Sequence, residues 1–343
     1  IEPSCMFSKS ELYDMYSFSE KHEICKEYNS IEFDNTQPFS LLKSDQIGKY
    51  VNINSNGFRG SEINANDNYK IFFLGGSTVF GAVTSSDETT IPGFVEKKLN
   101  DKGFDVTVIN AGISAATTVD EIYVLKEHVL KFKPNMIVMY DGWNDLHHID
   151  TLKFTISYDE YLKNDHFTNN NAIDETKIDE TKIDETKIDE TKGTGIIKFF
   201  GDINYKTGLG LALYASDIVY KGNLPDLSQD ISSSKLNRIE LNMKQNWSEI
   251  CALGDVHGFQ TVNFIQPLLG SSDRIIHPNE RILLSTGEHV KYLINLNFEE
   301  KIQSCTNIFD LRNSLVGEDN ILYYFDVGHM SDFGYEVMAD KIT

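Results

Sequence analysis

The sequence predicts an α/β fold built on a mainly parallel sheet. Compact apolar runs of strand length recur along the chain, and most are followed by a stretch with apolar residues at helical spacing. The runs stop at small or polar residues, as strands do where they enter a loop. Strands that alternate with helices in this way form parallel βαβ units. The 343 residues allow one large domain, or one domain with a sizeable insertion.

Five strands are expected, with helices between most of them. The apolar runs place the strands at residues 69–74, 106–109, 136–140, 260–265 and 307–311. Helical spacing places helices at 89–99, 119–132, 236–253 and from 332 to the end of the chain. Pro92 suits the first turn of the first of these helices, and Ser331 or Asp332 would cap the last. A further short strand and turn are expected within 51–60.

The chain is expected to divide into an N-terminal extension and the α/β domain. Residues 1–68 mix aromatic and charged side chains without a clear period, which predicts an irregular extension. Residues 69–343 form the domain, interrupted by a variable insertion at about 151–235; a second variable, partly helical segment is expected at 268–300.

The insertion contains a repeat, in which Ile-Asp-Glu-Thr-Lys occurs four times over 173–192. A period of five residues matches neither a helix nor a strand, and one Ile per repeat buries too little apolar surface to order the segment. We expect a solvated loop, with a charged single helix as the alternative.

The charge balance excludes some partners. The formal net charge is -21, from 31 basic and 52 acidic residues, which disfavours binding to nucleic acid or to anionic lipid. No apolar run approaches the roughly 18 residues that a membrane-spanning helix needs. The chain begins at Ile1 and not at Met, so we expect that an upstream signal or anchor was removed and that the protein is extracytoplasmic or secreted.

Four cysteines are present, and no two have the spacing of a zinc ligand pair. A bridge between Cys5 and Cys25 would staple an N-terminal stretch that has little core of its own. Cys251 and Cys305 could form a second pair. The even count fits an oxidising compartment, and four buried free thiols are the alternative.

Four short blocks follow predicted strands or precede the final helix. In an open parallel sheet, ligands bind outside the carboxyl ends of the strands, so these blocks are where functional residues are expected. The blocks are Gly75-Gly76-Ser77-Thr78, Gly112, Gly142-Trp143-Asn144-Asp145 and Asp326-Val327-Gly328-His329.

Together these blocks contain the parts of a nucleophilic site. Serine is a weak nucleophile until a base takes its proton, and His329 could serve Ser77 in this way. Asp326 lies three residues earlier and could bind the far ring nitrogen of the histidine. The backbone N–H groups of Ser77 and Gly112 and the side-chain amide of Asn144 could stabilise an oxyanion. Each block alone has an ordinary explanation as a turn or a cap; their joint order indicates a catalytic site.

The four blocks resemble those of the SGNH (GDSL) hydrolase superfamily, over roughly residues 69–150 and 236–343. The resemblance implies a flavodoxin-like three-layer α/β/α sandwich and a Ser-His-Asp triad. The first block departs from the family name, because it reads Gly-Gly-Ser-Thr and not Gly-Asp-Ser-Leu. The stretch 54–60 is weakly similar to a feature of SGNH proteins linked to surface polysaccharide. The matching positions are Ser77, Gly112, Asn144, Asp326 and His329.

The function that follows is hydrolysis of carboxylic esters through an acyl-enzyme, with no metal and no organic cofactor. The substrate would be a small-molecule or polymer ester, such as an acylated glycan. One alternative is an O-acetyltransferase or acetylesterase acting on surface polysaccharide, and a second is a non-catalytic glycan-binding protein. The first block lacks the lysine of a phosphate loop, Gly-x-Ser-x-Gly is absent, and His147-His148 lacks partners at metal-ligand spacing.

Overall fold

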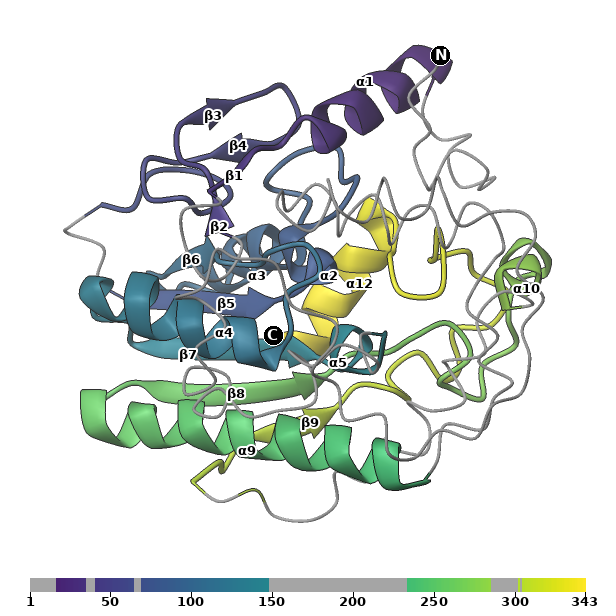
Figure 1. The fold of residues 1–343 in the computed structure, drawn as a ribbon. Helices are drawn as coiled ribbons and strands as arrows, with labels where there is room; N and C mark the ends of the chain where they lie inside the picture. The colour runs from purple at the N-terminus through teal and green to yellow at the C-terminus, as the bar shows by residue number, and fades with distance from the viewer. Residues whose placement is uncertain (1–16, 35–40, 65–68, 148–232, 285–301, 303) are drawn as a thin grey trace, which may run out of the picture.

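The centre of the protein is a five-stranded parallel sheet, seen in a computed structural model that describes residues 17–34, 41–64, 69–147, 233–284, 302 and 304–343 (Figure 1). The spatial order is β6-β5-β7-β8-β9, and each neighbouring pair is parallel. Numbered along the chain, this order is 2-1-3-4-5, which is the flavodoxin-like order. The strands are β5 (Lys70–Gly75), β6 (Thr107–Asn110), β7 (Met136–Asp141), β8 (Gln260–Ile265) and β9 (Ile308–Asp310).

Helices cover both faces of the sheet, which confirms the predicted three-layer α/β/α arrangement. Side chains alternate along β5, so Phe72 and Leu74 join one buried cluster while Ile71 and Phe73 join the other. The first cluster packs beneath α4 (Thr118–Val124) and α9 (Ser233–His257), and the second beneath α3 (Ile91–Asp101) and α12 (Asp332–Ile342). Figure 1 shows α9 running alongside β8.

The predicted helices form, with one local difference. The expected helix at 119–132 is regular only as α4, and it continues as a π-helical turn, η2 (Leu125–Val129), and a 3-10 turn, η3 (Leu130–Phe132). Ser331 caps α12, its side chain accepting a hydrogen bond from the Gly334 N–H. The described residues after the N-terminal segment also contain three short helices: α2 (Ser77–Phe80), α5 (Trp143–His147) and α10 (Pro278–Leu284).

The N-terminal segment is more regular than the sequence analysis expected, within the part that the structure describes. It contains α1 (Phe18–Asn29) and four short strands that pair antiparallel as β1 (Phe33–Asp34) with β2 (Leu41–Leu42) and β3 (Gln46–Ile47) with β4 (Asn52–Ile53). A capping box between Ser17 and Glu20 begins α1. Few of its side chains are apolar, so hydrophobic periodicity missed the helix, whereas the Ser-x-x-Glu signature was present.

This segment packs onto the domain. Ile24 of α1, Leu42 of β2 and Ile53 of β4 belong to the same buried cluster as Phe72 and Leu74 of the central sheet. Apolar packing therefore crosses residue 68, where the sequence predicted a domain boundary. The repeat at 173–192 and most of the insertion at 151–235 lie outside the described residues.

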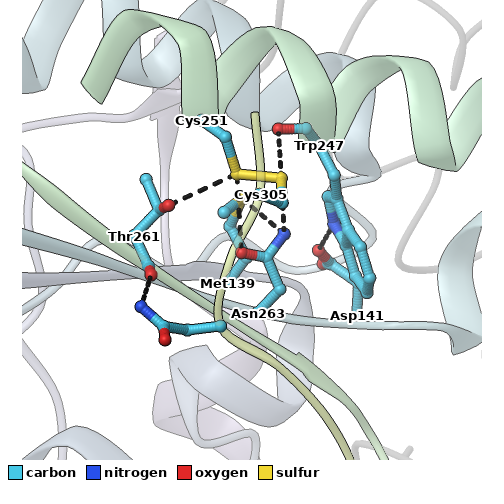
Figure 2. Close-up of a disulfide and its surroundings, with 8 residues drawn as sticks. Met139, Asp141, Trp247, Cys251, Thr261, Asn263 and Cys305 are labelled. Atoms are coloured by element: carbon cyan, nitrogen blue, oxygen red, sulfur yellow. Dashed lines mark hydrogen bonds between the residues drawn. A yellow bond between two sulfur atoms is a disulfide. The ribbon is translucent and has the colours of Figure 1, made fainter. Parts of the chain in front are cut away.

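A disulfide joins Cys251 of α9 to Cys305, which confirms the predicted second pair (Figure 2). Cys251 is buried against β8, where the Thr261 hydroxyl donates to its Sγ over 3.3 Å, and Cys305 is partly buried. Cys25 is also disulfide-bonded, and its expected partner, Cys5, lies outside the described residues. No helix among the described residues is long and apolar enough to cross a membrane.

Candidate active site

Three of the predicted site residues form a continuous chain of hydrogen bonds. Ser77 follows β5 as the first residue of α2, and Asp326 and His329 lie in the loop that leads to α12. The distance from Ser77 Oγ to His329 Nε2 is 2.7 Å. The distance from His329 Nδ1 to Asp326 Oδ2 is also 2.7 Å. The fold thus brings together side chains that are 252 positions apart in the sequence.

The loop around Asp326 fixes the orientation of the imidazole. Asp326 Oδ1 accepts the backbone N–H groups of Gly328 and His329 over 2.8 and 2.7 Å, which leaves Oδ2 for the ring. Burial by itself would raise the pKa of the Asp326 carboxyl, but His329 and the two N–H donors outweigh it and lower the pKa below its ordinary value. An ionised Asp326 favours a proton on Nδ1, so Nε2 can accept the proton of Ser77.

Glycine at 75 and 76 lets the chain turn sharply before the serine. Gly75 has a φ of +156°, and a Cβ there would lie 2.4 Å from Val79 Cγ2. A Cβ on Gly76 would lie 2.0 Å from Asn144 Nδ2. Any larger residue at 76 would therefore push the Asn144 amide away from the serine block.

Asn144 lies beside this turn because its strand is paired with β5. Gly75 is opposite Tyr140 of β7, so the loops that follow the two strands are neighbours. Asn144 Nδ2 donates to the Ala116 carbonyl over 2.7 Å, which holds the amide in place. The amide has two hydrogens, and among the described residues this is the one partner found for Nδ2.

Gly112 does not have the free donor that the sequence analysis assigned to it. Its N–H donates to Asn110 Oδ1 over 3.0 Å. A Cβ at this position would lie 2.4 Å from the Phe80 nitrogen. The glycine therefore allows β6 to pack against α2, and its N–H is already engaged within the loop.

The turn Ile113–Ala116 was missed by the sequence analysis. The Ile113 N–H donates to the Gly75 carbonyl over 3.0 Å, and the Ala116 N–H donates to the Ile113 carbonyl, which closes the turn. Ala115 has a φ of 64°, a left-handed conformation that a non-glycine residue rarely adopts. Among the described residues, the N–H groups of Ser114 and Ala115 have no partner. No glycine marks this position, so the sequence carried no signal for it.

Arg59 is a second residue whose role the sequence did not reveal, although it lies in the stretch 54–60. It is 3% exposed, and its Nε forms an ion pair with Asp87 Oδ1 at 2.8 Å. Its Nη1 donates to the carbonyls of Phe80 and Gly81 over 2.8 and 2.7 Å. Arg59 thus binds carbonyl groups at the end of α2, the helix that begins with Ser77.

Several buried acids lie on β7, α4 and α5, the elements around Asn144. Asp145 Oδ1 accepts the Thr118 hydroxyl over 2.7 Å, and Asp141 Oδ2 accepts the indole N–H of Trp247 over 2.7 Å. Burial raises the pKa of Asp145 to about 7. Burial also raises the pKa of Glu121 well above its ordinary value, and the neighbouring Asp141 charge adds to this. The carboxyls of Asp145 and Asp141 thus link α5 to α4 and β7 to α9.

One further candidate, Trp143, lies beside the loop of His329. Trp143 is half-buried, and a Cβ on Gly328 would lie 3.9 Å from its indole ring, so the ring borders the loop of His329. The side chain of His147 and all of His148 lie outside the described residues. Within the described part of the chain, no group of three or more His, Cys, Asp or Glu side chains could hold a metal ion.

Comparison with known proteins gives structural neighbours only. No family model matches the chain, and no curated protein matches it. A lipase/acylhydrolase from Enterococcus faecalis is similar at 16% identity and a TM-score of 0.41, over 80% of this chain and 93% of that one. An acetylxylan esterase from Geobacillus stearothermophilus is similar at 13% identity and a TM-score of 0.39, over 82% and 94% of the two chains.

A third solved structure is described as a lipolytic protein of the G-D-S-L family from Desulfitobacterium hafniense. It is similar at 13% identity and a TM-score of 0.38, over 80% of this chain and 98% of that one.

Proposed function

We propose that this protein is a serine hydrolase that cleaves carboxylic esters through an acyl-enzyme. The observation that carries the proposal is the hydrogen-bonded chain from Ser77 Oγ through the His329 ring to Asp326. A serine at a sharp strand-to-helix turn, a histidine within hydrogen-bond reach and a buried carboxylate are what this chemistry requires.

The reaction follows from the direction of these hydrogen bonds. Ser77 Oγ attacks the ester carbonyl carbon while His329 Nε2 takes the hydroxyl proton. The tetrahedral intermediate collapses, its bond to the alcohol oxygen breaks, and His329 returns the proton to that oxygen. Water then attacks the acyl-serine by the same route, which releases the acid and restores Ser77. Asp326 stays ionised throughout and stabilises the imidazolium.

The oxyanion of each intermediate needs donors in place before the reaction. The Ser77 N–H has no partner among the described residues, and Asn144 Nδ2 has a second hydrogen beside the one bound to Ala116. We assign both as donors. In place of Gly112, whose N–H is bound to Asn110, we assign a backbone N–H of the turn Ile113–Ala116.

The test is hydrolysis of p-nitrophenyl acetate, butyrate and octanoate by the wild type and by Ser77→Ala. We expect the variant to lose at least about 10³-fold in kcat, because the nucleophile is gone, with an unchanged circular dichroism spectrum. Ser19→Ala, which removes an exposed hydroxyl from α1, is the matched control and should keep wild-type activity. A Ser77→Ala protein that hydrolyses these esters at the wild-type rate would overturn the proposal.

The same residues could pass the acyl group to a sugar hydroxyl, so acetyl transfer to a glycan remains the alternative. Product analysis with a sugar acceptor present separates the two: acetate indicates hydrolysis, and an acetylated sugar indicates transfer. Labelling of Ser77 by a fluorophosphonate probe separates both from a non-catalytic glycan-binding protein, which would not label.

A further inference from the structure

The N-terminal helix reaches the candidate active site through Tyr28. This residue lies in the last turn of α1, and its hydroxyl is 2.8 Å from the hydroxyl of Ser114. Its ring lies 6.0 Å from that of Phe80, the last residue of the helix that begins with Ser77. Burial raises the pKa of the phenol above its ordinary value and outweighs the hydrogen bond to Ser114 and the charge of Arg59, which lower it; the charge of Asp326 adds a smaller upward contribution. Tyr28 is therefore a neutral donor or acceptor within the electrostatic reach of the site.

Ser114 belongs to the turn Ile113–Ala116, whose Ala116 carbonyl accepts the hydrogen bond of the Asn144 amide. The turn Ile113–Ala116 is attached at three points: by its first N–H to the Gly75 carbonyl, by the Ser114 hydroxyl to Tyr28, and by the Ala116 carbonyl to Asn144. The first and third attachments come from the central sheet and its loops. The second comes from a segment 86 positions earlier in the sequence.

The turn needs such attachments because its backbone is strained. Ala115, next to Ser114, has a φ of 64°, and a non-glycine residue keeps this conformation only where its surroundings enforce it. Without the Tyr28 bond, the turn is free to relax toward an ordinary conformation, and both the Ala116 carbonyl and the turn's free N–H groups would shift. Small displacements of oxyanion donors reduce rates strongly, since the donors act where charge develops.

We propose that Tyr28 is a positioning residue, whose hydrogen bond to Ser114 holds the turn that completes the oxyanion hole. The inference rests on the proposed hydrolase function. In this proposal the N-terminal segment contributes to the active site through Tyr28, although the main resemblance to the hydrolase superfamily begins only at residue 69.

The test is a double-mutant cycle with Tyr28→Phe and Ser114→Ala, measured as kcat and KM on p-nitrophenyl acetate. Each single variant should lower kcat roughly 3- to 10-fold, the effect of one hydrogen bond, and leave KM within about twofold. The double variant should lose no more than the worse single variant, because both changes remove the same bond.

The matched control is Tyr50→Phe. The Tyr50 hydroxyl donates to Glu23 Oε2 of the same helix over 3.1 Å, away from the turn, so this variant loses a similar hydrogen bond and should keep wild-type kcat. A general loosening of α1 would lower kcat in all three single variants and would overturn the inference, as would a wild-type kcat in Tyr28→Phe or losses that multiply in the double variant.

The comparison with Ser77→Ala shows whether only the role of Tyr28 is wrong or the proposed hydrolase function is wrong as well. If the wild type hydrolyses the ester in a Ser77-dependent way and Tyr28→Phe is unaffected, only the role of Tyr28 is wrong. If the wild type does not hydrolyse it and no fluorophosphonate labels Ser77, the hydrolase function fails and the role of Tyr28 fails with it.

Discussion

Asp145 shows how one buried side chain makes the region behind the site sensitive to pH. It follows Asn144 in α5, is 4% exposed, and binds the hydroxyl of Thr118 at the start of α4. Asn246 of α9 donates to the same hydroxyl over 2.9 Å. Three elements therefore meet at Thr118, and the charge state of Asp145 decides whether this junction contains a buried anion.

The stability of the wild type should fall as the pH rises through this titration. Burial raises the pKa of Asp145 to about 7 in the folded protein, against an ordinary value of 3.8. At a pH below 3.8, Asp145 is protonated in both the folded and the unfolded protein, and the folded state is not penalised. Between pH 3.8 and about 7 the carboxyl ionises in the unfolded chain but not in the fold, so the free energy of unfolding falls, by an amount of the order of 4 kcal/mol in total.

Replacing Asp145 by Asn should remove this dependence, since an amide keeps an acceptor for Thr118 and does not ionise. The free energy of unfolding in urea, measured from pH 4 to pH 8, should therefore rise in Asp145→Asn relative to the wild type as the pH increases. A difference between the two proteins that is constant over this range would show that the carboxyl is not protonated in the fold.

At the scale of elements, the four-residue helix α2 depends on Arg59. A helix this short has little stability of its own, and its terminal carbonyls need partners. Arg59 supplies two N–H bonds to Phe80 and Gly81, and its charge is balanced by Asp87. Replacing a buried cation that makes several hydrogen bonds destabilises the fold, because the carboxylate and carbonyl groups that it bound are left buried without a partner.

Arg59→Lys should lower the free energy of unfolding by about 2–4 kcal/mol, because lysine keeps the charge but lacks the planar set of five donors. Arg281→Lys is the control: Arg281 is exposed on α10, and its Nε donates one hydrogen bond to the Ile276 carbonyl over 3.3 Å, so the same change should cost less than about 1 kcal/mol. Urea denaturation of both variants measures the two costs, and equal losses would contradict the role assigned to Arg59.

The elements that the sequence predicted well are those with strong local signals. The apolar run at 260–265 coincides with β8, and Ser331 caps α12 as expected. By contrast, α1 contains few apolar residues and so lacks a clear hydrophobic period. The strain at Ala115 is enforced by contacts with distant segments, which local sequence does not encode.

At the scale of the whole molecule, the site residues also divide into those that local sequence signals predict and those that depend on contacts between distant segments. Ser77, Asn144 and the Asp326–His329 block could be proposed because each lies next to a predicted strand or the final helix, and parallel strands bring their carboxyl ends to one edge. The Gly112 N–H, to which the sequence assigned a donor role, is bound to Asn110 in the structure. Tyr28 could not be proposed, because its role depends on how α1 packs against a turn 86 positions later.

The disulfide between Cys251 and Cys305 links two parts of the chain that are separated by 54 positions (Figure 2). It joins α9 to the segment before β9, so it attaches the edge of the sheet to the helix that covers it. Asn263 of β8 lies against both cysteines and is fully buried. The bond is on the α9 side of the sheet, whereas the hydrogen bonds of Ser77 and His329 involve loops at the ends of the strands.

Removing this bond should therefore reduce stability without reducing activity. Closing a loop of 54 positions lowers the entropy of the unfolded chain by an amount worth about 4 kcal/mol. The double variant Cys251→Ala and Cys305→Ala should lose up to this free energy of unfolding in urea, with a steeper denaturant dependence because its unfolded state is more expanded. Substitution is preferable to a reducing agent, which would also act on the disulfide of Cys25. If kcat on p-nitrophenyl acetate fell together with stability under native conditions, the covalent link would be holding the active-site loops as well as the edge of the sheet.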